Sequence, residues 1–138
     1  MRSTAGQLGA SWAWYLVSPT WSGIWPAAAK PVAYNDGKTI KTVILMTDGV
    51  YNTIGGVNWG DNSAQAVQAS QLSVDICAGM KAKGVVVYTV GFDVNNAGPS
   101  KQRVIDTLTA CASDPAKFYR AEDGAALDAA FRDIAADI

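Results

Sequence analysis

Residues 41–49 have the sequence Lys-Thr-Val-Ile-Leu-Met-Thr-Asp-Gly, and this stretch decides the fold. Its long or β-branched apolar side chains form an unbroken run between a lysine and a turn. Such a run predicts a β-strand that is buried on both faces, as in the interior of a parallel sheet. The strand carries Asp48 at its carboxyl end. Because open α/β sheets bind ligands at the carboxyl ends of their strands, Asp48 is the first candidate site residue.

The composition is that of one folded domain over residues 1–138. A chain of this length leaves no room for two full cores. Hydrophobic residues make up 49% and charged residues 17%, which is typical of a globular protein rather than a disordered one. No apolar run approaches the roughly 20 residues of a membrane span, and the first residues lack the pattern of a signal peptide.

Charge and residue types exclude several function classes. The net charge is −1 and the eleven Lys and Arg residues are scattered, so nucleic acid is not an expected partner. The chain has no histidine, which excludes Ser-His-Asp triads and His-ligated zinc. Dinucleotide fingerprints, phosphate loops and the Gly-x-Ser-x-Gly nucleophile elbow are also absent from the sequence.

Helical and strand patterns alternate along the chain, which predicts an α/β fold of three layers with helices on both faces of a parallel sheet. A strand, a helix and a second strand in succession form a right-handed crossover between parallel neighbours. Asp93 ends the second strand as Asp48 ends the first, so both carboxylates belong at one edge of the sheet. We expect helices over residues 3–17, 62–83, 100–112 and 123–138, and strands over residues 41–48, 85–90 and 117–120.

Local signals predict how these helices begin and pack. Ser3 or Thr4 is an N-cap candidate for the first helix, and Asp123 is one for the last. Asn62, with a glutamine three residues later, resembles a capping box for the second helix. The expected buried stripe of this second helix consists of Ala69, Leu72, Ile76 and Met80.

Two connecting segments are unusually long. Residues 18–40 contain two tryptophans and three prolines, and we expect this Trp-rich loop to cover the sheet edge, with a partner-binding surface as the alternative. Residues 50–61 are rich in glycine and polar groups. Loops this long are uncommon in a compact domain unless they contribute to a site.

Several motifs together resemble a known family. The chain resembles the carboxyl-terminal portion of a von Willebrand factor A (VWA) domain, of the TadG-like type from the bacterial Tad/Flp pilus assembly system. The resemblance extends from Thr4 to the last helix. The residues that carry it are Met46-Thr47-Asp48-Gly49, Tyr51-Asn52-Thr53, the strand Val87-Tyr88-Thr89-Val90-Gly91-Phe92-Asp93, Cys111-Ala112-Ser113 and Phe118-Tyr119.

The resemblance implies a Rossmann-like VWA fold that lacks its first three strands. It also implies a function: a non-enzymatic protein-binding or adhesion module at the bacterial cell envelope or periplasm, within a longer protein and with pilus components as partners. Two alternatives differ in class. One is a Rossmann-like enzyme that uses Asp48 as metal ligand or nucleophile, and the other is a truncated, nonfunctional fragment.

The resemblance further implies a metal-ion-dependent adhesion site for Mg²⁺. Asp48 matches the aspartate of that site, and Thr4 is the candidate for its threonine. Asp93 is an electrostatic contributor at most. The Asp-x-Ser-x-Ser element that completes such a site is absent, so we expect incomplete coordination and weak Mg²⁺ binding. The alternative roles are structural: Asp48 shaping a turn and Thr4 capping a helix.

Cys77 and Cys111 have two interpretations. They are either small buried hydrophobic residues or partners in a disulfide. The resemblance implies a location outside the cytoplasm, where disulfides form, and so favours the Cys77–Cys111 disulfide.

The resemblance leaves the strand over residues 42–48 without its natural neighbour. An apolar strand that is unpaired along one side tends to recruit another strand. We therefore expect self-association through this edge. The alternatives are a complementary segment from another chain and the Trp-rich loop folded over the edge.

Overall fold

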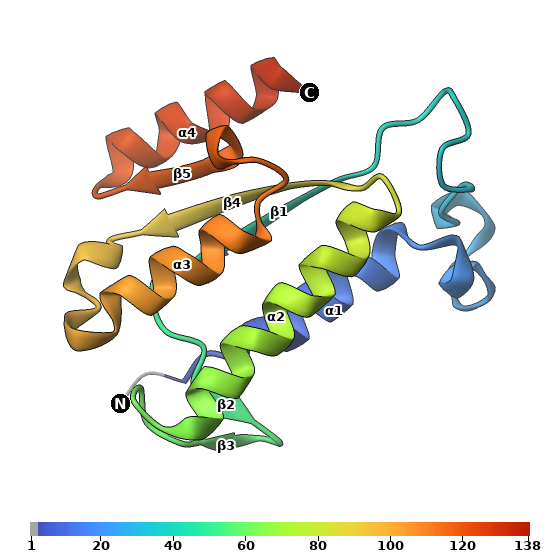
Figure 1. The fold of residues 1–138 in the computed structure, drawn as a ribbon. Coiled ribbons are helices and arrows are strands. Elements are labelled where there is room, and N and C mark those ends of the chain that lie inside the picture. Colours follow the sequence, from blue (N-terminus) through green and yellow to red (C-terminus); the bar gives the residue numbers. More distant parts are fainter. Residues whose placement is uncertain (1–2) are drawn as a thin grey trace.

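The computed structural model describes residues 3–138 and has the α/β architecture that the sequence predicts (Figure 1). One sheet is parallel, with strand order β1-β4-β5, and a separate antiparallel hairpin joins β2 to β3. The helices are α1 (Gly6–Val17), α2 (Ala64–Ala82), α3 (Lys101–Cys111) and α4 (Gly124–Asp137), and the strands are β1 (Thr42–Thr47), β2 (Thr53–Ile54), β3 (Val57–Asn58), β4 (Val86–Phe92) and β5 (Phe118–Ala121).

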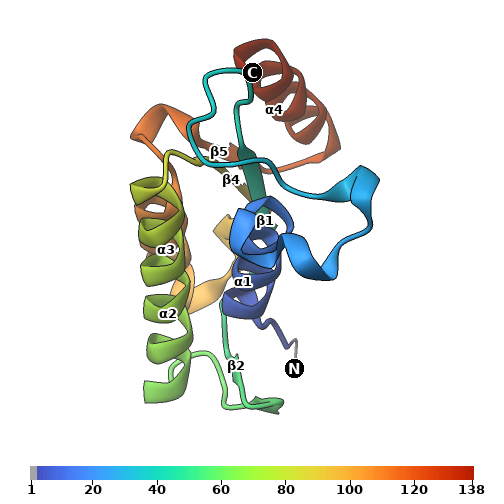
Figure 2. The same ribbon diagram turned by 90° about the vertical axis from the view of Figure 1, so that its right-hand side faces the viewer.

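The parallel sheet is the middle layer of three. On one face, Val43 of β1 and Val87 of β4 form a core with Cys77 and Met80 of α2, against which α1 packs. On the other face, Tyr88 and Val90 are buried with Ile134 of α4, and the partly buried Leu127 packs against them. Figures 1 and 2 show α1, α2 and α3 on one side of the sheet and α4 on the other. This is a Rossmann-like arrangement, with β4 in the centre.

Burial of β1 is less complete than predicted. Ile44 and Met46 are 39% and 54% exposed, whereas the neighbouring residues on β4, Tyr88 and Val90, are buried. The reason is that α4 covers β4 and β5 but does not extend over β1, which lies at the end of the sheet. The prediction of a strand buried on both faces is therefore wrong for β1, and it is β4 that has this burial.

Two of the predicted helix starts differ from the structure. The N-cap of α1 is Ala5, without a side-chain bond, so neither Ser3 nor Thr4 caps it. The N-cap of α2 is Ser63, whose hydroxyl accepts a bond from the amide of Ala66, so the capping box at Asn62 is wrong. The predicted cap at Asp123 is confirmed, because its carboxylate accepts a bond from the amide of Ala126.

Small residues form the buried face of α2. Ala69 and Met80 lie on it as predicted, but Leu72 points outward and is 39% exposed. Ser73 takes a core position instead and donates its hydroxyl to the carbonyl of Ala69 (3.0 Å), which satisfies a polar group that would be costly to bury alone. The buried residues of this helix are Ala66, Ala69, Ser70, Ser73, Cys77 and Met80.

The Trp-rich loop does not cover the sheet edge. It contains short 3₁₀ helices, η1 (Pro19–Ile24) and η2 (Ala27–Ala29), and packs against the end of α1. The indole of Trp25 donates to the carbonyl of Tyr15 (3.2 Å), and that of Trp14 donates to the hydroxyl of Tyr34 (2.8 Å). The loop forms no strand beside β1 among residues 3–138, and Ile44 and Met46 remain exposed.

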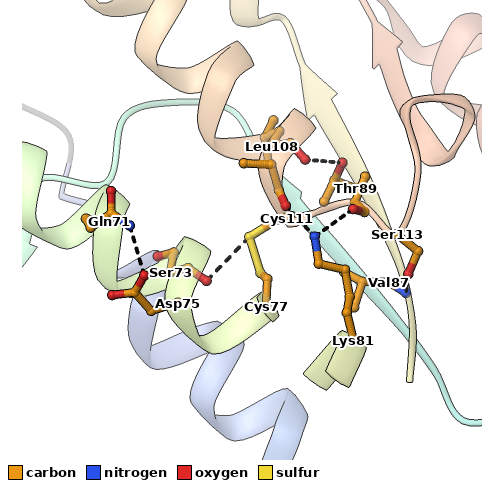
Figure 3. The surroundings of a disulfide bond; sticks show 12 residues. Gln71, Ser73, Asp75, Cys77, Lys81, Val87, Thr89, Leu108, Cys111 and Ser113 are labelled. Atoms are coloured by element: carbon orange, nitrogen blue, oxygen red, sulfur yellow. Dashed lines mark hydrogen bonds between the residues drawn. A yellow bond between two sulfur atoms is a disulfide. The ribbon is translucent and has the colours of Figure 1, made fainter. Parts of the chain in front are cut away.

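A disulfide joins Cys77 of α2 to Cys111 of α3, as the resemblance favoured over two free thiols. The sulfur atoms are 2.07 Å apart and both residues are buried (Figure 3). Beside it, Thr89 of β4 donates its hydroxyl to the carbonyl of Leu108 (2.9 Å). The Lys81 ammonium donates to the carbonyl of Ala112 (3.0 Å), next to the end of α3, where a positive charge is favourable.

Within residues 3–138, no helix has both the length and the apolar character needed to cross a bilayer.

Candidate functional site

A polar cavity of about 280 Å³ lies at the carboxyl ends of β1 and β4. This is the edge at which the sequence placed the candidate site. All three acidic or hydroxyl candidates, Asp48, Thr4 and Asp93, line this cavity. The full lining consists of Thr4, Asp48, Gly49, Val50, Asn52, Asp61, Asp93, Asn96 and Ala97.

Asp48 reaches the cavity because the chain turns directly after β1. The buried hydroxyl of Thr47 accepts a bond from the amide of Gly49 (3.2 Å) and lies 3.1 Å from its carbonyl oxygen. A threonine turn of this kind fixes the local backbone. The Thr47 hydroxyl thus shapes this turn, and the Asp48 side chain lies at the cavity wall.

Asp93 occupies the corresponding position after β4. Its backbone is left-handed (φ 51°), a conformation that aspartate tolerates better than most residues. Its backbone amide donates to the carbonyl of Ala121 (2.8 Å), which ties it to β5, and its carboxylate accepts a bond from the side-chain amide of Asn96 (2.6 Å). Asp93 is therefore held at the same edge as Asp48, as the strand pattern predicts.

Thr4 enters the cavity from the other end of the chain. Its carbonyl accepts bonds from the amides of Asn52 (3.0 Å) and Thr53 (3.2 Å), and its own amide donates to the Asn52 side chain (2.9 Å). These bonds join the residues before α1 to the loop after β1. The N-cap role for Thr4 is wrong, because Ala5 occupies that position.

Asn52 is the residue that connects this site, and the sequence alone did not assign it a role there. It is buried, and besides binding Thr4 it donates its side-chain amide to the carboxylate of Asp61 (2.7 Å). Its carbonyl also accepts a bond from the amide of Trp59 (3.0 Å). Asn52 therefore fixes Asp61, a third carboxylate that the sequence did not single out, in the wall of the cavity.

The β2–β3 hairpin brings Asn52 and Asp61 together. Its turn residues Gly55 and Gly56 have positive φ angles of 61° and 78°, which glycine adopts without strain. The sequence marked residues 50–61 as irregular and did not predict this hairpin. The signal that could have revealed it is the Gly-Gly pair between Thr53-Ile54 and Val57-Asn58, a typical two-residue hairpin connection.

Tyr51 attaches the start of α1 to the loop beneath the cavity. Its side chain is buried, and its ring lies so close to Gly6 that a Cβ at position 6 would be 2.2 Å from a ring carbon. Burial raises the pKa of the Tyr51 hydroxyl to about 12. The glycine at position 6 thus allows the close approach that keeps Thr4 next to Asn52.

The cavity lining offers the types of ligand that Mg²⁺ binds, but too few of them. Carboxylate and hydroxyl oxygens are the ligands that Mg²⁺ takes, and Asp48 and Thr4 offer both. However, no three acidic, cysteine or histidine side chains within residues 3–138 lie close enough together to hold a metal ion. An ion in this cavity would depend on water, amide or hydroxyl oxygens, or groups from another molecule for most of its ligands.

The cavity is acidic. Three aspartates line it, and its lining, all within the part of the chain that the structure describes, includes no lysine or arginine. Carboxylates gathered around a partly enclosed space attract cations and disfavour anions. The arrangement is therefore suited to a cation or to a basic group of a partner.

Comparisons of this chain with models of known protein families, with characterised proteins and with solved structures find no match.

Proposed function

We propose that this chain is a non-enzymatic protein-binding module of the VWA type, which acts in Tad/Flp pilus assembly or adhesion at the bacterial cell envelope. One observation carries the proposal. Thr4 and Asp48 are far apart in sequence, yet both line the same acidic cavity at the carboxyl edge of the parallel sheet. These are the two positions that the resemblance assigns to a metal-ion-dependent adhesion site.

The incompleteness of the ligand set supports a role in binding a partner. Asp48 and Thr4 would hold the ion through few protein ligands, so its remaining positions would be taken by water or by an oxygen of another protein. With Mg²⁺ bound in the cavity, an acidic side chain of a partner is a suitable further ligand, because its carboxylate oxygen fills a coordination position that this chain leaves open. The same ligand shortage predicts that the chain binds Mg²⁺ weakly by itself.

The test is calorimetric titration of the folded chain with Mg²⁺ and with Mn²⁺. We expect weak, saturable binding to the wild type and an affinity lower by about tenfold or more for Asp48→Asn, since this variant loses the charged ligand. The control is Asp75→Asn, which removes an exposed carboxylate on α2 that does not line the cavity and should leave the affinity unchanged.

Two results would refute the metal-binding part of the proposal: no binding to the wild type by either ion, or equal affinities for the wild type and Asp48→Asn. The assembly role is tested in a bacterium that carries the Tad/Flp system. In a strain that lacks the gene for this protein, the wild-type sequence should restore pilus formation, and Asp48→Asn should not.

A further inference from the structure

β1 presents an open edge. Its residues pair with β4 along one side, and no strand among residues 3–138 pairs with it along the other. Ile44 and Met46 are exposed on the α4 face of the sheet, beside the buried Tyr88 and Val90. An edge with free backbone groups and apolar side chains is a template for pairing with a further strand.

The exposed side of α1 adjoins this edge. A hollow of about 310 Å³ lies between the two elements, with Gly9 and Ala10 of α1 on one side and Leu45 and Met46 of β1 on the other. Trp12 and Leu16 follow Gly9 by three and seven residues, so they lie on the same side of the helix. In Figure 2, α1 lies next to β1, at the end of the sheet opposite β5.

This side of α1 is strongly apolar. Leu8, Trp12 and Leu16 are each more than half exposed, and they form a row with a spacing of four residues. We call this row together with Ile44 and Met46 the edge surface. Groups of exposed apolar side chains on both sides of an open strand edge are features of sites of association.

The edge surface carries no charge. None of the residues of α1 or β1 is acidic or basic, and residues 3–29 as a whole contain no charged side chain. A surface that contacts its own copy across a twofold axis brings each residue near its counterpart, so any charge near the axis would face a like charge. The edge surface avoids that repulsion, because none of its side chains is charged.

We propose that two copies of this chain associate through the edge surface, with β1 of one copy antiparallel to β1 of the other. A twofold axis perpendicular to the sheet produces this pairing and preserves the layers. It brings α1 next to α1 on one face, and the Ile44–Met46 pair next to the same pair on the other. The two sheets then become one continuous sheet.

The opposite edge of the sheet explains why association stops at two copies. That edge is β5, a strand of four residues flanked by charges, with Lys117 before it, Arg120 within it and Glu122 after it. Charged side chains on a short strand discourage further pairing. Each copy therefore has one edge that recruits a strand, and pairing of that edge closes the assembly.

The first experiment measures the molar mass of the intact chain by size-exclusion chromatography with light scattering. We expect the wild type to have twice the chain mass of 14.5 kDa and Met46→Lys to have the chain mass itself. A lysine at this exposed position places a charge at the axis and disfavours the pairing. Trp12→Lys, on the α1 side, is a second variant with the same expectation, in case Met46→Lys fails to fold by circular dichroism.

The matched control is Val67→Lys. Val67 is an α2 residue about as exposed as Met46 and lies outside the edge surface, so this variant should remain a dimer. Hydrogen exchange then identifies the contact. The amides of residues 42–47 should gain protection as the wild-type concentration rises and should stay unprotected in Met46→Lys.

Three results would overturn the proposal: a wild type that is monomeric at high concentration, a dimer that persists in both lysine variants, or open-ended aggregation in place of a closed dimer. If a different protein supplies the complementary strand, the isolated wild type would be monomeric, which is the first of these results. The experiment needs no metal ion, so its outcome is independent of the Mg²⁺ titration.

Discussion

At the scale of single residues, one glycine determines how closely α1 approaches α2. A Cβ added at Gly79 of α2 would lie 2.5 Å from the Cη2 atom of Trp14. The indole of Trp14 has little freedom to move away, because its N–H donates to the hydroxyl of Tyr34 (2.8 Å). The ring thus lies directly on the helix backbone, and this contact joins α1, α2 and the Trp-rich loop.

We predict that Gly79→Ala destabilises the fold. Alanine is favoured over glycine in a helix by about 1 kcal/mol, but forcing an extra methyl group into a packed contact costs about 1–3 kcal/mol. We expect the second effect to be the larger, because the bond to Tyr34 must lengthen or break as the ring shifts. The free energy of unfolding in urea should fall by about 1 kcal/mol or more.

Gly9→Ala is the matched control. Gly9 lies in α1, and a Cβ there would meet no atom within 4 Å. This variant keeps the gain in helix propensity without the clash, so its unfolding free energy should rise by up to about 1 kcal/mol. Changes of the same sign in both variants would show that contact with Trp14 does not decide the outcome at position 79.

The candidate site illustrates which residues the sequence could predict. Asp48 and Asp93 were predictable because each directly follows an apolar strand run, and parallel strands bring their ends to one edge. Asn52 and Asp61 were not. Their role depends on a side-chain bond between residues nine apart, which exists only because a hairpin of two-residue strands folds the chain back.

At the scale of elements, sequence patterns located every long helix and the three strands of the parallel sheet. Their ends shifted by one or two residues at β4 and β5. The hairpin was missed because two residues per strand are too few to show alternation. The predicted buried face of α2 was partly wrong. Hydrophobicity favoured Leu72 for this face, but close packing against the neighbouring elements places alanine and serine residues there.

The last helix, α4, is attached to the sheet at its carboxyl end by a cluster of polar side chains. The carboxylate of Asp137 accepts bonds from the ammonium of Lys117 and from the hydroxyl of Tyr88 (2.6 Å). The bond from Lys117, followed by that from Tyr88, holds the pKa of Asp137 below its usual range. These contacts connect the end of α4 to β4 and to the start of β5.

We predict that this cluster makes stability depend on pH in the acid range. Because the pKa of Asp137 is lower in the folded chain than in the unfolded one, its contribution is present above the unfolded value and is lost as the pH falls through the folded value. Asp137→Asn should therefore be less stable than the wild type at pH 7. The difference should shrink as the pH falls below about 4, the range in which aspartate titrates.

The measurement is urea unfolding at a series of pH values between neutral and acidic. Asp133→Asn serves as the control, since it removes an exposed aspartate from the same helix, outside the described cluster. Its pH profile should follow that of the wild type. A constant offset between Asp137→Asn and the wild type at all pH values would contradict the assigned titration.

At the scale of the whole molecule, a covalent cross-link joins helices on only one face of the sheet. The disulfide connects α2 and α3 on the face that also holds α1, whereas α4 is attached to the other face by packing and by polar contacts. The sequence pattern alone did not decide whether the two cysteines form a disulfide or remain free thiols. The structure resolves it because both helices follow strands of the same crossover series and so lie side by side.

We predict that the Cys77→Ala/Cys111→Ala double variant folds but is less stable by about 2–4 kcal/mol. The bond closes a loop with a sequence separation of 34 residues, and its loss restores conformational freedom to the unfolded chain. Alanine suits the vacated positions because α2 already packs through alanines and serines there. Urea unfolding of the oxidised wild type and the double variant gives the difference.

A reducing agent separates the disulfide from the other effects of the substitution. Because both cysteines are buried, reduction of the wild type requires unfolding, and in denaturant with a thiol reductant its unfolding midpoint should fall toward that of the double variant. The double variant should have the same midpoint with and without reductant. If the reductant left the wild type unchanged, the disulfide would not be the source of this stability, and cohesion of α2 with α3 would rest on side-chain packing alone.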